Sequence, residues 1–289
     1  MSRRRGWFSG SVALALVAGL SLGAPGFVLD AQRGVHNPAR WSDTPGSLAD
    51  DGQRGLGGGI EYAVAADFCQ NLLPRFVHDQ PQPSCDQLAD ALRGAFALWA
   101  ADHPALRFVD VTGRLRPALP PAQQPWLGFG AEIDVFALSA DAFPNVRGLG
   151  AWTSTWWLNA APRGTHGRTL NGVSYTSADI VFNAGQGCLF FDPDLQGRGC
   201  DHFATLALHE IGHALGLHHP DEFPGENWDT DDDPANLMTI DCDAPARGLM
   251  KSRAVDRDAV MTPQSPKRVA TRLSNDDLSG RNFLYPICG

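Results

Sequence analysis

The spacing of apolar residues along the chain predicts three main helices. After Ser84, apolar side chains recur at helical intervals as far as Trp99, and Ser84 with Gln87 forms an S-x-x-Q capping box. A second helix is predicted to begin at Asp201, a good N-cap residue, and to run through "HFATLALHEIGHAL". A third follows Ser274 in "LSNDDLSGRNFLY", where acidic residues in the first turn suit the helix dipole.

Five shorter segments have the pattern of strands. They cover residues 60–65, 106–111, 131–138, 149–157 and 177–183. Five strands make a sheet of ordinary size. The order of strands and helices predicts one α+β domain over residues 60–289. A flexible segment rich in Gly, Pro and Asp is expected before it, at residues 32–59.

The N-terminus has the composition of a secretory signal peptide. Three arginines at residues 3–5 precede the apolar run "SVALALVAGLSLG" at residues 11–23. This run is shorter than the ~20 residues that span a bilayer, so a cleaved signal is favoured over a stable membrane anchor. Cleavage is expected between residues 24 and 31. Residues 1–31 are therefore the expected signal peptide, and the mature protein is expected to be secreted.

Charge and cysteine content narrow the class of protein further. The net charge of −9 argues against nucleic acid as a partner, because no basic stripe offsets it. Six cysteines in an exported chain indicate disulfide bonds. Proximity in the sequence favours Cys69–Cys85 and Cys188–Cys200, which leaves Cys242–Cys288. A monomer is expected.

The strongest chemical signal is the stretch "HEIGHALGLHHP". On a helix, His209 and His213 are four residues apart and lie on one face, while the apolar residues lie on the opposite side. Glu210 lies about 100° around the helix from His209, near whatever the histidines hold. Gly216 can end the helix in a left-handed conformation, so that His219 approaches from the other side.

The spacing H-E-x-x-H-x-x-G-x-x-H predicts a zinc site with His209, His213 and His219 as ligands. A catalytic zinc has three protein ligands and an open position, whereas a closed structural zinc site has four and usually includes cysteines. The spacing favours His219 over His218, which is expected to be an exposed or supporting residue. An amphipathic helix without metal does not explain a glutamate and three spaced histidines in an apolar run.

This string resembles the signature of the metzincin metalloproteases. The resemblance implies a zincin catalytic domain with a twisted, mostly parallel five-stranded sheet and three main helices, one of which carries the active site. It also implies a methionine turn beneath the metal, and Met238 in "ANLMT" looks like that turn. Loosely, the resemblance extends over residues 60–286 and is greatest to the matrixin branch.

Several positions depart from the matrixin pattern. No cysteine precedes Cys69, so the cysteine that caps zinc in a matrixin propeptide has no counterpart. The histidines of the matrixin structural zinc are absent, which predicts a single zinc ion. Pro220 after the third histidine is more similar to serralysins, yet Ile240 stands where those enzymes have a tyrosine. The subfamily therefore stays open between a matrixin-like and a separate bacterial-type branch.

The resemblance implies an endopeptidase that hydrolyses peptide bonds of a protein or peptide substrate. A zinc-activated water is expected to attack the carbonyl, with Glu210 as general base. The strand at residues 149–157 is expected at the sheet edge over the cleft, where an extended peptide can pair with it. Trp152 and Trp156 either bind substrate there or only pack.

Other possibilities remain open from sequence alone. Clustered carboxylates at residues 191–201 and 229–236 suit calcium, although acidic loops of this kind are usually only solvated. The chain can be a non-catalytic zinc-binding or adhesive protein, or a zinc hydrolase of non-peptide amides. The intact Glu210 favours catalysis, because a binding protein has no need of a general base.

Overall fold

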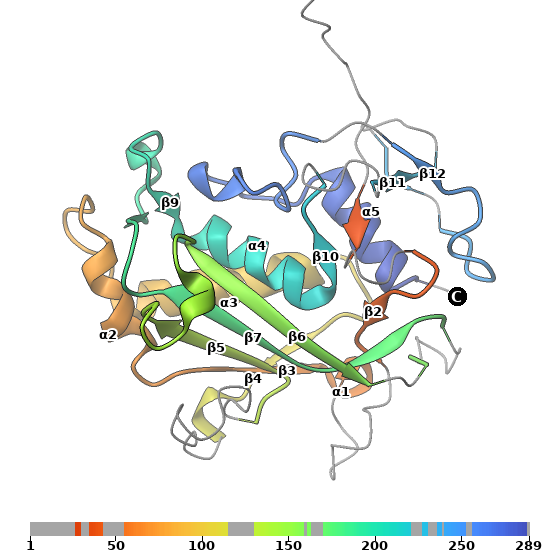
Figure 1. Ribbon diagram of the computed structural model, residues 1–289, viewed down its shortest axis with the longest axis horizontal. Coiled ribbons are helices and arrows are strands. Elements are labelled where there is room, and N and C mark those ends of the chain that lie inside the picture. Colours follow the sequence, from red (N-terminus) through yellow and green to blue (C-terminus); the bar gives the residue numbers. More distant parts are fainter. Residues whose placement is uncertain are drawn as a thin grey trace, which may run out of the picture.

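Figure 1 shows a computed structural model of the protein. It describes residues 27–29, 35–42, 55–114, 130–158, 161–162, 170–220, 227–230, 236–238, 240–252 and 256–287. The architecture is α+β, with a mostly parallel sheet and the main helices packed against one face of it. This agrees with the fold class expected from the sequence pattern.

The main sheet has six strands in the order β2-β7-β5-β3-β4, with β6 added beside β7. All pairings are parallel except that of β6 with β7, and β6 is an edge strand. The strands are β2 (Ala39–Arg40), β3 (Ile60–Val64), β4 (Phe108–Asp110), β5 (Ile133–Leu138), β6 (Ala151–Leu158) and β7 (Val173–Asn183). The five predicted strands are confirmed, and β2 is the strand that the sequence pattern did not indicate.

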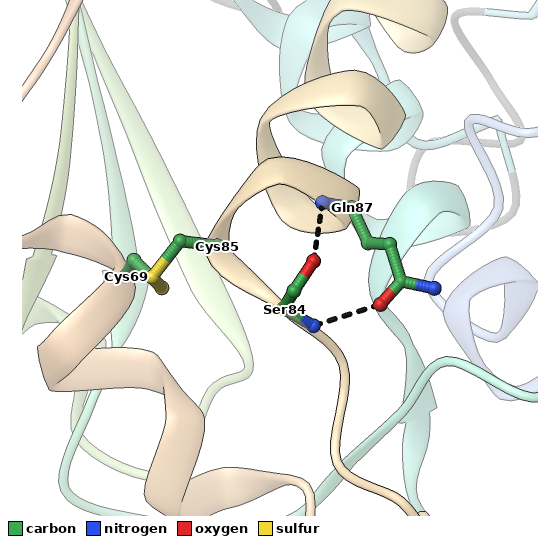
Figure 2. The surroundings of a disulfide bond; sticks show 4 residues. All are labelled: Cys69, Ser84, Cys85 and Gln87. Carbon is green, nitrogen blue, oxygen red and sulfur yellow. Dashed lines mark hydrogen bonds between the residues drawn. A yellow bond between two sulfur atoms is a disulfide. The ribbon is translucent and has the colours of Figure 1, made fainter.

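Helices α3 (Cys85–Ala100) and α4 (Phe203–Leu215) lie side by side across the sheet, and α5 (Asn275–Leu284) packs near the C-terminal end of α4 (Figure 1). The capping box predicted at Ser84 is present, because Ser84 and Gln87 bond to each other's backbone N–H. Short helices α1 (Gly55–Gly58) and α2 (Phe68–Leu72) precede them. Cys69 of α2 is joined by a disulfide to Cys85, next to this capping box (Figure 2).

The predicted N-cap of the histidine helix is wrong by one residue. Asp201 belongs to β9 (Asp201–His202), and the N-cap position of α4 is His202, whose side chain makes no capping bond. Asp201 instead forms an ion pair with Lys267. Capping rules based on sequence miss this, because the Asp201 carboxylate pairs with Lys267, which is far away in the chain, and not with the backbone N–H groups of α4.

Three two-stranded sheets complete the fold. They pair β1 (Val28–Leu29) with β10 (Leu217–His218), β8 (Leu189–Phe190) with β9, and β11 (Trp228–Asp229) with β12 (Met250–Lys251). The predicted disulfide Cys188–Cys200 is confirmed. Cys242 is also disulfide-bonded, but its predicted partner Cys288 lies outside the described residues.

Part of the segment expected to be flexible belongs to the core. Residues 35–42 carry β2, and Trp41 and Arg40 are buried there. The Trp41 indole donates a hydrogen bond to the carbonyl of Ala214, at the end of α4. Phe27 and β1 are buried too, although they fall within the expected signal peptide. No helix in the described part of the chain is long and apolar enough to cross a membrane.

Candidate metal centre

Three histidine nitrogens meet at one point beside α4. His209 and His213 lie one turn apart on the helix, and Gly216 ends it with a positive φ of 108°. The chain then passes through β10, which brings His219 back to the pair. The Nε2 atoms of the three rings are 3.0 Å (His209–His219), 3.0 Å (His213–His219) and 3.1 Å (His209–His213) apart. The structure therefore brings together the three ligands predicted from their spacing.

Backbone carbonyls determine which ring nitrogen carries the proton. His209 Nδ1 is 2.7 Å from the carbonyl of Val260, and His213 Nδ1 is 2.8 Å from the carbonyl of Leu217. A carbonyl only accepts, so each Nδ1 is the N–H donor and each Nε2 presents a lone pair. Burial lowers the pKa of His209 to about 3 and that of His213 well below its usual value, so both rings are neutral.

Two lone pairs that face each other at 3.1 Å repel, and a cation between them removes the repulsion. Zinc binds neutral imidazole nitrogens at ~2.0–2.1 Å, which in a tetrahedral arrangement places the nitrogens about 3.3 Å apart. The observed separations of 3.0–3.1 Å are close to that value. The residues present therefore fit a zinc ion with three protein ligands.

Glu210 lies buried next to this cluster. Its Oε2 accepts a hydrogen bond of 2.6 Å from the hydroxyl of Thr153, a residue of the edge strand β6. Burial raises the pKa of Glu210 to about 7, and the bond from Thr153 acts in the opposite direction. A carboxyl group held in this way can both accept and release a proton near neutral pH.

An open cleft of about 520 Å³ runs past the histidines and Glu210. Its lining includes the start of β6 with Trp152, and also Pro263 and Pro266. Trp152 is 39% exposed, so it is available to a ligand. Trp156 is not among the residues that line the cleft. The docking role predicted for the two tryptophans therefore has structural support at Trp152 alone.

The methionine against the histidine helix is Met261. A Cβ placed on Gly212 of α4 would lie 2.2 Å from Met261 Sδ, and the residue before this methionine, Val260, accepts the bond from His209. Met238 is also buried, and its N–H donates to the hydroxyl of Ser279 in α5. The sequence analysis assigned the methionine turn to Met238 from the segment "ANLMT", whereas Met261 is the methionine whose sulfur lies against Gly212 of α4.

His218 occupies a supporting place. It lies in β10, where it pairs with Val28 of β1, and its ring centroid is 5.4 Å from that of His213.

In the described part of the chain, one other group brings three ligand atoms together, namely His78, Cys188 and Cys200. Its two cysteines form a disulfide, so their sulfurs are not available as thiolate ligands.

The two segments predicted to bind calcium are only partly described. Asp192 accepts a bond from the N–H of Asp194, and Asp201 is paired with Lys267, so these carboxylates serve the local fold. Much of the second segment, residues 231–235, lies outside the described residues. Calcium binding stays a prediction.

Comparison with known proteins adds nothing to this geometry. No protein-family model matches the chain, and no curated protein matches it at a significant level.

Thr153 and Met261 are the neighbours of the site that the sequence analysis missed. Met261 carries a weak signal, since it is one of four methionines in the chain, whereas nothing in the sequence distinguishes Thr153.

Proposed function

We propose that this protein is a secreted zinc-dependent endopeptidase of the metzincin type. The observation that carries the proposal is the convergence of three imidazole Nε2 atoms beside a buried glutamate in an open cleft. A structural zinc site is closed by four protein ligands, whereas three ligands and a cleft leave room for water and substrate. Export is supported by the basic and apolar N-terminus together with the disulfides.

His209, His213 and His219 would hold the zinc ion. A zinc ion in this place supplies a Lewis acid that polarises the peptide carbonyl and makes the attacking water more acidic. Glu210 accepts a proton of that water as the new C–O bond forms, and then delivers it to the nitrogen of the leaving amine as the peptide C–N bond breaks. The carbonyls of Val260 and Leu217 keep His209 and His213 in the tautomer that binds metal.

The edge strand β6 is the expected docking site for substrate. It pairs only with β7 in the described sheet, and residues at its start line the cleft. An extended peptide can add to such an edge through main-chain hydrogen bonds. This mode suits a polypeptide substrate better than a small amide, because it uses the repeating backbone of the ligand.

The first experiment compares the purified protein with its Glu210→Gln variant on an unfolded protein substrate. The parent is expected to cleave the substrate. The rate of the variant is expected to be about 10²- to 10⁴-fold lower, because a glutamine cannot accept the proton. Bound zinc, measured by elemental analysis, is expected to be equal in both. A folded parent that holds zinc and cleaves nothing would contradict the endopeptidase and favour a binding role.

The zinc ligands are tested in the same experiment with a matched pair of neighbours. His219→Ala is expected to lose most of its zinc and its activity, whereas His218→Ala is expected to keep zinc. The two substitutions remove the same side chain from adjacent positions, so a general loss of folding would affect both. Equal zinc content in the two variants would contradict the ligand assignment.

A further inference from the structure

The hydroxyl of Thr153 contacts the same glutamate twice. Thr153 Oγ1 is 2.6 Å from Oε2 of Glu210 and 3.1 Å from the main-chain carbonyl oxygen of the same residue. Among the described residues, no other side chain makes a hydrogen bond to this carboxylate. The general base is therefore connected to the sheet through one hydroxyl group.

The bond from Thr153 occupies Oε2 and leaves the other carboxylate oxygen, Oε1, without a side-chain donor among the described residues. Oε1 is then the oxygen that can take the proton of water and pass it on to the amine, while Oε2 continues to accept from the hydroxyl. The contact with Thr153 therefore does not have to break during the reaction.

The hydroxyl itself is well fixed. Thr153 lies in the ladder of β6 with β7, opposite Ile180. Threonine is branched at Cβ, which restricts its χ1 angle. The side chain points from the strand toward α4, as its two contacts with Glu210 show. A strand that lies along the cleft thus determines where the carboxylate stands.

We propose that Thr153 is a positioning residue for the general base Glu210, and this rests on the proposed function. The hydroxyl holds the carboxylate where it can accept the proton of the attacking water and later release it to the amine. Because Thr153 also belongs to the strand expected to pair with substrate, the position of the base is tied to the position of the peptide. Thr153 does not touch the reacting atoms itself.

The test replaces the hydroxyl without changing the shape of the side chain. Thr153→Val is expected to lower kcat about 10- to 100-fold, because a small displacement of a catalytic group reduces the rate by that order. KM is expected to stay within about twofold, since substrate pairing with the strand is retained. Thr153→Ser keeps the hydroxyl and is expected to restore most of kcat.

A matched control comes from the neighbouring strand. The hydroxyl of Thr176 in β7 donates to the carbonyl of Trp156, so it ties the same two strands without reaching Glu210. Thr176→Val is expected to keep the parental kcat, with a thermal midpoint similar to that of Thr153→Val. If both valine variants lower kcat equally, or if Thr153→Val leaves kcat unchanged, the positioning role is excluded.

Crystal structures of the zinc-loaded parent and Thr153→Val provide a readout that does not depend on activity. The carboxylate of Glu210 is expected to move or to occupy several positions in the valine variant. An unmoved carboxylate would overturn the inference even if the protein is an endopeptidase. Conversely, a parent that cleaves nothing would contradict the proposed function, while the displaced carboxylate would still show that Thr153 holds it.

Discussion

Gly212 shows how closely single residues are packed beneath the histidines. It lies on α4 between His209 and His213, where a Cβ atom would be 2.2 Å from Met261 Sδ and 2.8 Å from Trp99 Cζ2. The indole of Trp99 is itself held by a hydrogen bond of 2.7 Å to the carbonyl of Leu208. Glycine is needed at this position because Met261 and Trp99 fill the space that a side chain would take.

We expect Gly212→Ala to lower the free energy of unfolding by about 1–3 kcal/mol, the usual cost of an extra methyl group in a packed core. Gly94 of α3 is the control, because a Cβ there has no neighbour within 4 Å. Gly94→Ala is expected to stabilise the protein by about 0.5–1 kcal/mol, since alanine loses less conformational freedom in a helix. Urea unfolding measures both, and a stable Gly212→Ala variant would contradict the packing.

At the level of elements, two strands bring a pair of carboxylates together on the main sheet. Asp134 of β5 is in register with Asp179 of β7, and both are buried. Burial, and then the negative charge of Asp134, raise the pKa of Asp179 to about 8. The parallel register of β5 and β7 places the two carboxylates opposite each other. The sequence of either strand alone does not reveal their repulsion.

Asp179 is expected to make stability fall as pH rises. Its ordinary pKa is 3.8, so between about pH 4 and pH 8 the unfolded chain has lost a proton that the folded chain keeps. The free energy of unfolding should then decrease by up to roughly 1.4 kcal/mol per pH unit from this group. The contribution of Asp179 to the free energy of unfolding is complete below about pH 4 and is lost as the pH rises through about 8.

Asp179→Asn tests this directly, because an amide resembles the protonated acid. We expect the variant and the parent to be similarly stable near pH 4 and the variant to be the more stable one near pH 8. Urea unfolding at several pH values measures the difference. The same pH dependence in both proteins would show that Asp179 is ionised in the folded state.

Across the whole molecule, residues far apart in the chain meet at the C-terminal ends of α4 and α5. Trp41, which directly follows β2, donates its indole N–H to the carbonyl of Ala214, and the Tyr285 hydroxyl donates to the carbonyl of Leu215. The buried guanidinium of Arg40 donates to the carbonyl of Leu284. The start of the described chain, the end of α4 and the end of α5 therefore form one unit.

We expect Trp41→Ala to lower the free energy of unfolding by about 3–5 kcal/mol, as for other fully buried aromatic residues. Trp152→Ala, at a partly exposed position, is expected to change it by less than about 1 kcal/mol. Thermal or urea unfolding of the two variants provides the comparison. A small effect at Trp41 would mean that residues 35–42 are not part of the folded core.

The sequence alone was sufficient for features whose cause lies within a few residues. The capping box at Ser84, the strand segments and the face shared by His209 and His213 follow from local bonding and from helix geometry. Two disulfides were also predicted from proximity in the chain. The position of the predicted ligand His219 belongs to the same class, because one glycine turn separates it from the helix.

Only the tertiary structure decided which distant residues complete the site. Met261 packs against Gly212 of α4, Thr153 reaches Glu210 across 57 positions, and β2 joins a sheet whose other strands begin at residue 60. Contacts of this kind depend on how the whole core closes, not on the preference of any short segment. These contacts stabilise the protein only once the strands and helices are assembled. For that reason no local sequence pattern predicts them.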